Sequence, residues 1–181
     1  MSTRWVALLR GINVGGANKL SMADLRATLA MLGFDDVVTY IQSGNAIFDA
    51  GADADENALG ASIAGALDTE HGLAVPVVVR PADDLARIAR SHPDAGRGID
   101  PKLLHVLFLD SMPTTGATAA LDPARFEPDG WTVDGREIYV RYPDGSGRSK
   151  LTIEVFERSL DVTATARNLN TVRKLVDLAD R

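Results

Sequence analysis

The sequence predicts an α+β protein made of two ferredoxin-like (split βαβ) halves packed into one compact unit. In the first 80 residues, apolar runs and amphipathic patterns follow the order strand, helix, strand, strand, helix, strand. Residues 81–181 partly repeat that order. With 181 residues, 45% of them hydrophobic, the chain is long enough for a substantial core. No linker marks independent domains, so we expect a single structural unit over residues 1–181 with pseudo-halves 1–80 and 81–181.

The first predicted strand is RWVALLR at residues 4–10, a continuous apolar run of the kind found in strands buried on both faces. A helix follows, because Ser21 and Asp24 have the spacing of a capping box. Gly33 is placed for the left-handed residue that ends the helix. The apolar stripe of this helix consists of Met22, Leu25, Leu29 and Leu32.

Two β-rich pieces, residues 37–41 and 46–48, flank a short polar turn and predict a hairpin. A second helix starts at Asp55 and is closed by Gly72. The apolar run at 74–80 completes the first half as a buried strand. The stripe of the second helix consists of Leu59, Ile63 and Leu67.

In the second half, Pro81 opens a helix and residues 103–109 form a buried strand, whereas residues 111–123 hold at most a short helix. WTVDGREIYVRY predicts a hairpin with Asp134-Gly135 as a type I′ turn and Tyr139 on its polar face. Helices are expected from about 150 to 160 and from about 171 to 180.

Composition excludes several classes of protein. The chain has no Cys, which removes disulfides, thiol nucleophiles and cysteine zinc sites. No apolar window is long enough to span a membrane, and the first residues do not resemble a secretory signal, so we expect a cytoplasmic protein. The net charge of −6 argues against general nucleic-acid binding, although it leaves room for a local basic patch.

The stretch LRGINVGGANKLSM at residues 9–22 is the first candidate site. Gly11 and Gly16 have the spacing of a P-loop, but Ala17 and Asn18 stand where that motif needs Lys and Ser. The dinucleotide fingerprint is also absent. The loop can still form an anion-binding nest, or its glycines can serve only to adopt positive φ angles. The ligand-binding candidates here are Arg10, Asn13, Gly15, Gly16 and Lys19.

The second candidate is PDGSGRSKLT at residues 143–152, where Arg148, Ser149 and Lys150 stand at an expected helix start, beside the N–H groups of its first turn. Cations at that point oppose the helix dipole, and an anion would relieve the cost. The alternative is a flexible connection with solvated charges.

Two further polar segments add candidates. In TATARNLNTVRKL, Arg167 either clamps backbone carbonyls or binds an anion, and Asn168 is one of three possible caps of the last helix. In QSGN, Ser43 and Asn45 either form a hairpin turn or reach the same site. No metal site and no cofactor are expected, because the three histidines have no metal-ligand spacing.

Together, the segments ALLRGINVGG, TYIQSGNAIF, GRSKLT and TARNLNT resemble the bacterial family catalogued as domain of unknown function 1697. The resemblance covers nearly the whole chain and implies a shared polar site without naming a reaction. Leu169 stands where the family usually has an aromatic residue. The family's characteristic positions correspond here to Arg10, Gly11, Asn13, Gly15, Gly16, Tyr40, Ser43, Gly44, Asn45, Lys150, Thr165, Arg167, Asn168 and Thr171.

Three functions are consistent with these residues. The first is binding of a small anionic or phosphorylated ligand through the polar loops. The second is an enzyme of phosphoryl or acyl transfer in which Lys150 or Ser149 reacts, and it requires a carboxylate within hydrogen-bonding reach of Ser149 or Ser43. The third is a binder of single-stranded nucleic acid, for which Tyr139 is the best stacking candidate.

Overall fold

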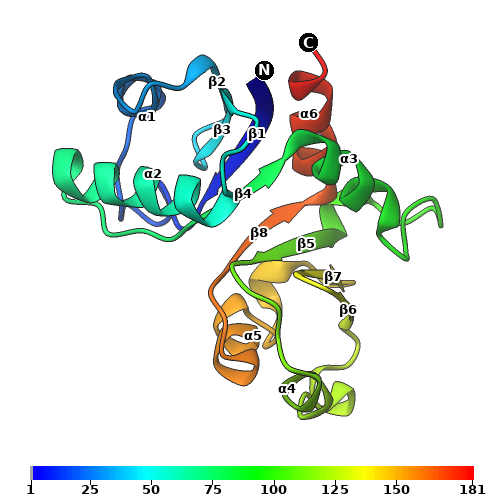
Figure 1. The fold of residues 1–181 in the computed structure, drawn as a ribbon. Helices are drawn as coiled ribbons and strands as arrows, with labels where there is room; N and C mark the ends of the chain where they lie inside the picture. Colours follow the sequence, from blue (N-terminus) through cyan, green and yellow to red (C-terminus); the bar gives the residue numbers. More distant parts are fainter. Residues whose placement is uncertain (1) are drawn as a thin grey trace. The chain divides into compact units, whose positions relative to one another are not determined.

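The computed structural model describes residues 2–181 (Figure 1), which divide into two compact units. Unit 1 comprises the residues up to Ala86 together with Lys174–Arg181, and unit 2 comprises Arg87–Arg173. Each unit holds one four-stranded antiparallel sheet. The predicted α+β class with two similar halves is therefore confirmed. That residues 1–181 act as a single structural unit stays a prediction.

In unit 1, α1 and α2 lie on one face of the sheet, whose strand order is β2-β3-β1-β4 (Figure 1). Alternate residues of β1, namely Trp5, Ala7 and Leu9, point into the core beneath these helices. The elements are β1 (Ser2–Leu9), α1 (Met22–Met31), β2 (Asp35–Tyr40), β3 (Asn45–Gly51), α2 (Glu56–His71) and β4 (Val77–Pro81).

The helix ends of unit 1 follow the local signals in the sequence. The Ser21 hydroxyl accepts a hydrogen bond of 3.0 Å from the backbone N–H of Asp24, as the capping box requires. The Asp55 carboxylate caps α2 in the same way, accepting from the N–H of Ala58 at 2.9 Å. Gly72 ends α2 with a φ of +64°.

In unit 2 the strand order is β6-β7-β5-β8, so in both sheets the first strand lies between the third and the fourth. This is the split βαβ arrangement. The core lies between the sheet and α5, around Leu107, Ile138 and Phe156. The elements are β5 (Leu104–Leu109), α4 (Thr115–Ala119), β6 (Gly130–Asp134), β7 (Glu137–Arg141), α5 (Ile153–Leu160) and β8 (Ala164–Asn168), with short 3₁₀ turns η1 (Pro101–Leu103), η2 (Pro123–Phe126) and η3 (Ser146–Arg148).

Two helices, α3 (Ala82–Ser91) and α6 (Leu169–Ala179), contain the boundaries between the units. Two predicted helix starts differ from the structure. Helix α6 begins at Leu169, two residues before the predicted start near 171, and α5 begins at Ile153, three residues after the predicted start near 150. No helix within residues 2–181 combines the length and the apolar character needed to cross a membrane.

Strand β8 is not predicted from the sequence, where this segment is interpreted only as a polar one. Its residues, ATARN, are small or polar and carry none of the β-branched apolar or aromatic side chains that usually mark a strand. Pairing with β5 decides its structure, with Leu107 opposite Ala166 and Leu109 opposite Ala164. Tertiary context overrides local propensity here.

The hairpin of β6 and β7 has the predicted faces but a different turn. Asp134 pairs with Glu137, so Gly135 and Arg136 are the central residues. Gly135 has a φ of +61°, while Arg136 is not among the residues with positive φ. A type I′ turn needs positive φ at both central positions, so that prediction is wrong.

Candidate functional site

The loop between β1 and α1 has an unusual backbone. Five of its residues have positive φ angles, between +47° and +81°. Glycine adopts this conformation without strain, and asparagine tolerates it better than most residues. These positive φ angles account for the glycine and asparagine residues of this loop. This agrees with the alternative that the glycines serve only to adopt such angles. The five residues are Gly11, Asn13, Gly15, Gly16 and Asn18.

Asn13 fixes this loop through its side chain. Its amide nitrogen Nδ2 donates to the backbone carbonyls of Leu20 at 2.8 Å and Gln42 at 2.7 Å. Its oxygen Oδ1 accepts from the N–H of Leu20 at 3.0 Å. The β1–α1 loop thus lies beside the β2–β3 turn. Unit 1 therefore brings two of the polar segments together, LRGINVGGANKLSM and QSGN.

The turn itself is held by Asn45, which is fully buried. Its Nδ2 donates to the carbonyl of Tyr40 and to the hydroxyl of Ser43, both at 3.0 Å. Gly44 has a φ of +79°, and a Cβ placed there would lie 2.8 Å from the Cβ of Leu9. These contacts support the simpler interpretation of QSGN as a hairpin turn. Arg10 is half-buried, whereas the side chain of Lys19 is exposed.

A pocket of about 180 Å³ lies in unit 2, at the loop between β7 and α5. Residues 125–129, which begin in the last part of η2, form one wall, and residues 144–150 contribute the other. Ser149 and Lys150, both predicted from the sequence, line it. Its charged lining residues are three cations, Arg125, Arg148 and Lys150, and three carboxylates, Glu127, Asp129 and Asp144.

Ser149 connects the two walls of this pocket. Its hydroxyl donates a hydrogen bond of 2.6 Å to Oδ2 of Asp129, and it accepts one of 2.7 Å from the N–H of Leu151. The buried hydroxyl of Tyr142 donates to the carbonyl of Leu151 at 3.0 Å. Burial raises the pKa of Tyr142 well above its usual value, so this hydroxyl stays a donor at neutral pH. The loop is thereby fixed next to the pocket.

The cations of this loop do not stand in the first turn of α5. Arg148 ends η3, and Lys150 lies three residues before Ile153, the first helical residue. The expectation that they oppose the dipole of α5 from within its first turn is therefore wrong. Both side chains are exposed and border the pocket instead.

Arg167 and Asn168 belong to β8 and have structural partners. Arg167 is buried, and its NH1 donates to the hydroxyl of Thr165 at 2.9 Å and the carbonyl of Ala166 at 2.8 Å. Burial lowers the pKa of Arg167 to about 10. Asn168 accepts from the N–H of Thr171 at 2.9 Å and caps α6. Neither residue is among those lining the pocket.

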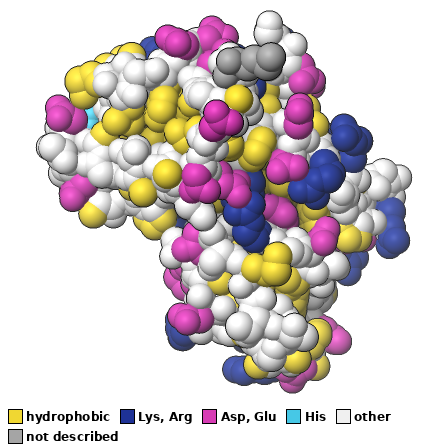
Figure 2. Space-filling model, viewed as in Figure 1, with side chains coloured by type: hydrophobic (Ala, Val, Ile, Leu, Met, Phe, Trp, Pro, Cys, Tyr) yellow, Lys and Arg dark blue, Asp and Glu magenta, His cyan; other side chains and the backbone are white. Residues whose placement is uncertain are grey.

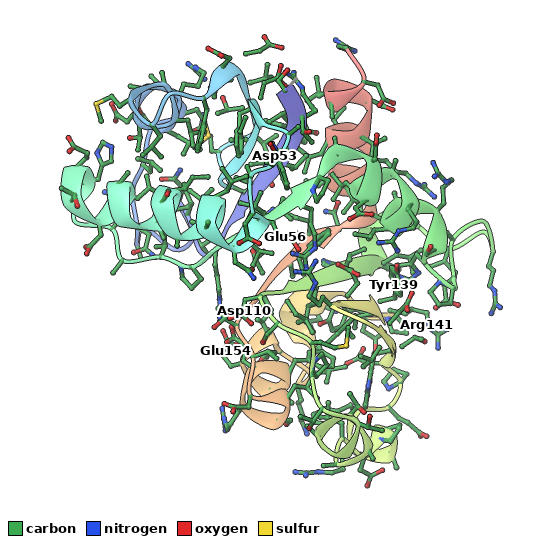
Figure 3. The ribbon with its side chains drawn as sticks, viewed as in Figure 1. Asp53, Glu56, Asp110, Tyr139, Arg141 and Glu154 are labelled. Atoms are coloured by element: carbon green, nitrogen blue, oxygen red, sulfur yellow. The ribbon has the colours of Figure 1, made fainter. Side chains whose placement is uncertain are left out.

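Tyr139 does not form a surface for stacking bases. It shares β7 with Arg141, labelled in Figure 3, but its side chain is only 3% exposed. Its ring lies 5.4 Å from that of His92 in an edge-to-face contact. The use of Tyr139 as a nucleic-acid stacking residue is therefore contradicted.

His92 is buried and His105, the other histidine of unit 2, is partly buried; the ring of His105 contacts Tyr142 edge to face at 5.1 Å. Burial lowers the pKa of His105 to about 4 and also lowers that of His92. Both imidazoles are therefore neutral at pH 7. Within residues 2–181 no group of three or more His, Asp or Glu side chains is arranged to hold a metal ion.

The sequence reasoning missed Arg125 and Asp129 as site residues. Asp129 lies 20 positions before Ser149 and reaches it only because β6 and β7 form a hairpin. No motif marks this pair, so folding alone brings it together. Arg148 lies beside Ser149 in PDGSGRSKLT. A cation next to glycines is the sequence feature that could have identified it as a site residue.

A further cavity, of about 190 Å³, lies in unit 1 between the end of α1 and the start of α2. It is lined mainly by apolar side chains, including Leu32, Phe34 and Leu59, and Figure 2 shows hydrophobic side chains gathered on this surface. Phe34 stacks on Phe48 at 4.5 Å, so the cavity borders the core.

Comparison with known proteins supports the fold but identifies no biochemical function. A family model described as "Protein of unknown function (DUF1697)" matches residues 2–139. No curated protein matches the chain. The solved structure of SP0830, a conserved bacterial protein from Streptococcus pneumoniae, is similar with a TM-score of 0.72, 22% identity and 99% coverage of each chain. The family match ends before residues 144–150 of the pocket.

Proposed function

The chain belongs to the DUF1697 family, whose function is unknown, and we propose from its residues that unit 2 binds a small phosphorylated ligand beside Lys150. The convergence of Arg125, Arg148 and Lys150 on one pocket is the observation that carries this proposal. Guanidinium and ammonium groups are the side chains best suited to phosphate oxygens.

The carboxylates of the pocket narrow the ligand class. Three carboxylates balance the three cations, so the lining has no net charge. A polyanion would meet repulsion from Asp129 and Asp144, whereas a ligand with one phosphate and several hydroxyl or amino groups could use both kinds of side chain. We therefore favour a monophosphorylated compound over polyphosphate or nucleic acid.

A thermal-shift screen tests this function with inorganic phosphate, sugar phosphates, nucleotides, polyphosphate and short RNA. A ligand at 100 times its Kd adds about 2.7 kcal/mol of stability, which raises Tm by several degrees in a chain of this size. We expect Lys150→Ala to abolish the shift and Lys102→Ala to keep it, since Lys102 is an exposed lysine outside the pocket. A shift that survives Lys150→Ala but disappears in Lys19→Ala would move the site to unit 1.

A second candidate function is phosphoryl or acyl transfer through Ser149. Its hydrogen bond to Asp129 supplies the carboxylate that this chemistry requires. In phosphoryl transfer, the Ser149 oxygen would form a bond to phosphorus while its proton passes to Asp129. The leaving oxygen would depart with the electron pair of the broken P–O bond. The test is mass spectrometry after incubation with acetyl phosphate, which can donate either group. We expect one added group on the wild type and none on Ser149→Ala.

Other parts of the functional hypothesis stay predictions. We propose a cytoplasmic location, which fractionation of cells producing the protein would test. The hypothesis of one site formed by all four polar segments, from Arg10 to Asn168, also stays a prediction. The ligand proposed above needs only residues of unit 2.

A further inference from the structure

A second pocket, of about 290 Å³, lies next to the first in unit 2. The two pockets have Arg125 and Phe126 in common. One wall of the second pocket continues η2 back to Ala120, and the other is made by α5 through Val155, Arg158 and Ser159. The two pockets therefore lie along the same pair of chain segments, residues 120–129 and 144–159.

Resting on the proposed function, we propose that the ligand is a nucleoside monophosphate whose phosphate binds beside Lys150 and whose base occupies the second pocket. Size supports two-pocket occupancy. Small-molecule sites span about 300–1,000 Å³; the first pocket alone, at about 180 Å³, falls below that range, whereas the two pockets together fall within it. A free phosphate or a short sugar phosphate would fill only the first.

The lining of the second pocket suits a flat ring with polar edges. Leu121 is 7% exposed and belongs to the core of unit 2, against which Phe126 and Val155 pack, so these side chains offer an apolar surface. Ser159, Asp122 and Arg158 add a hydroxyl, a carboxylate and a guanidinium, which can pair with the donors and acceptors of a base.

Arg125 joins the two halves of this site. Its guanidinium carbon lies 5.9 Å from the centre of the Phe126 ring, within the range of a cation–π contact. Because both pockets include Arg125, the same group can face the phosphate on one side and the ligand's ring on the other.

Calorimetric titration separates this inference from the proposed function. The probes are ribose 5-phosphate and the four nucleoside 5′-monophosphates, added to the wild type, Lys150→Ala and Ser159→Phe. Phe at position 159 would occupy the second pocket and leave the first open. Thermal unfolding of each variant reports whether it folds, and Arg158→Ala, an exposed substitution in the same pocket, replaces Ser159→Phe if that variant does not.

We expect at least one nucleotide to bind about tenfold more tightly than ribose 5-phosphate. Ser159→Phe should remove that advantage without changing the affinity for ribose 5-phosphate, and Lys150→Ala should weaken both. Equal affinities, or an advantage that survives both substitutions in the second pocket, overturn the nucleotide assignment. If ribose 5-phosphate still binds and depends on Lys150, the proposed function stands without it. If no phosphate compound binds, both fail.

Discussion

The hydroxyl of Ser149 donates a hydrogen bond of 2.6 Å to the carboxylate of Asp129, 20 residues earlier in the chain. The same hydroxyl accepts from the N–H of Leu151 at 2.7 Å. One small side chain thus fastens the β7–α5 loop to the start of the β6–β7 hairpin and lies on the wall of a pocket with three cations. This arrangement gives Ser149 a structural role that can be measured separately from ligand binding.

Removing the Ser149 hydroxyl is expected to destabilise the protein. Ser149→Ala leaves the Asp129 carboxylate and the Leu151 N–H without this partner, at a cost of about 1–3 kcal/mol. Asp129→Asn weakens the same contact, so the two substitutions should be non-additive by at least 0.5 kcal/mol, on the order expected for groups in contact. Urea unfolding of the two single variants and the double variant measures this coupling. Strict additivity would mean that the contact contributes nothing to stability.

Gly44 should tolerate alanine far less well than Gly15 does. A Cβ at Gly44 would lie 2.8 Å from Leu9 and 2.9 Å from Ile12, whereas nothing lies within 4 Å of one at Gly15. Both positions have positive φ, so both variants carry a strain of about 1–2 kcal/mol. Overpacking adds about 1–3 kcal/mol at Gly44 only. Equal unfolding free energies for the two variants would show that the turn can move away from β1.

Asn13 allows its backbone and side-chain roles to be separated. Asn13→Gly keeps easy access to positive φ but removes three hydrogen bonds to Leu20 and Gln42. At about 1 kcal/mol for each bond, we expect a loss of about 2–3 kcal/mol in Asn13→Gly and a larger loss in Asn13→Ala, which adds backbone strain. Thermal unfolding compares the two. If Asn13→Ala were more stable than Asn13→Gly, the positive φ at position 13 would not cause the expected backbone strain.

Stability is expected to fall between about pH 6.5 and pH 4 because of His105. Burial lowers its pKa in the folded protein from 6.5 to about 4, so the unfolded chain takes up the proton first as the pH falls. Each unit of difference in pKa is worth about 1.4 kcal/mol, which sets an upper bound of about 3.5 kcal/mol for this group. His105→Phe keeps an aromatic ring against Tyr142 and should show a shallower loss in urea unfolding across this range. Parallel curves for the wild type and the variant would exclude His105 as the cause.

Local signals predicted much of the fold. The capping box of Ser21 and Asp24, the stop at Gly72 and the apolar stripe of α2 each depend on residues within one helix, so the sequence alone indicates them. Strand β8 was missed because its small and polar residues gain their structure from pairing with β5. The two faces of the β6–β7 hairpin were predicted correctly, although the turn lies one residue later than predicted. Moving the turn by one residue changes the partner of each residue by two positions, so the same side chains stay on the same face.

The candidate site was less predictable for the same physical reason. Asn13 and Asn45 attract attention as polar residues in loops, but their side chains bind backbone groups across the β1–α1 loop and the β2–β3 turn. Only contacts formed on folding show that role. Conversely, Asp129 has no sequence signal and becomes a pocket residue through the hairpin that carries it toward Ser149. Ser149 and Lys150 were identified because their loop combines glycine, hydroxyl and cationic residues within ten positions.

The most direct test of the central claim is a titration of ribose 5-phosphate followed by the backbone amide signals in NMR. If unit 2 holds the phosphate site, saturable shifts should occur at Gly145, Arg148, Ser149 and Lys150 and disappear in Lys150→Ala. Shifts confined to Gly15, Gly16 and Lys19, or no saturable shifts at any amide, would contradict a phosphate site at the β7–α5 loop.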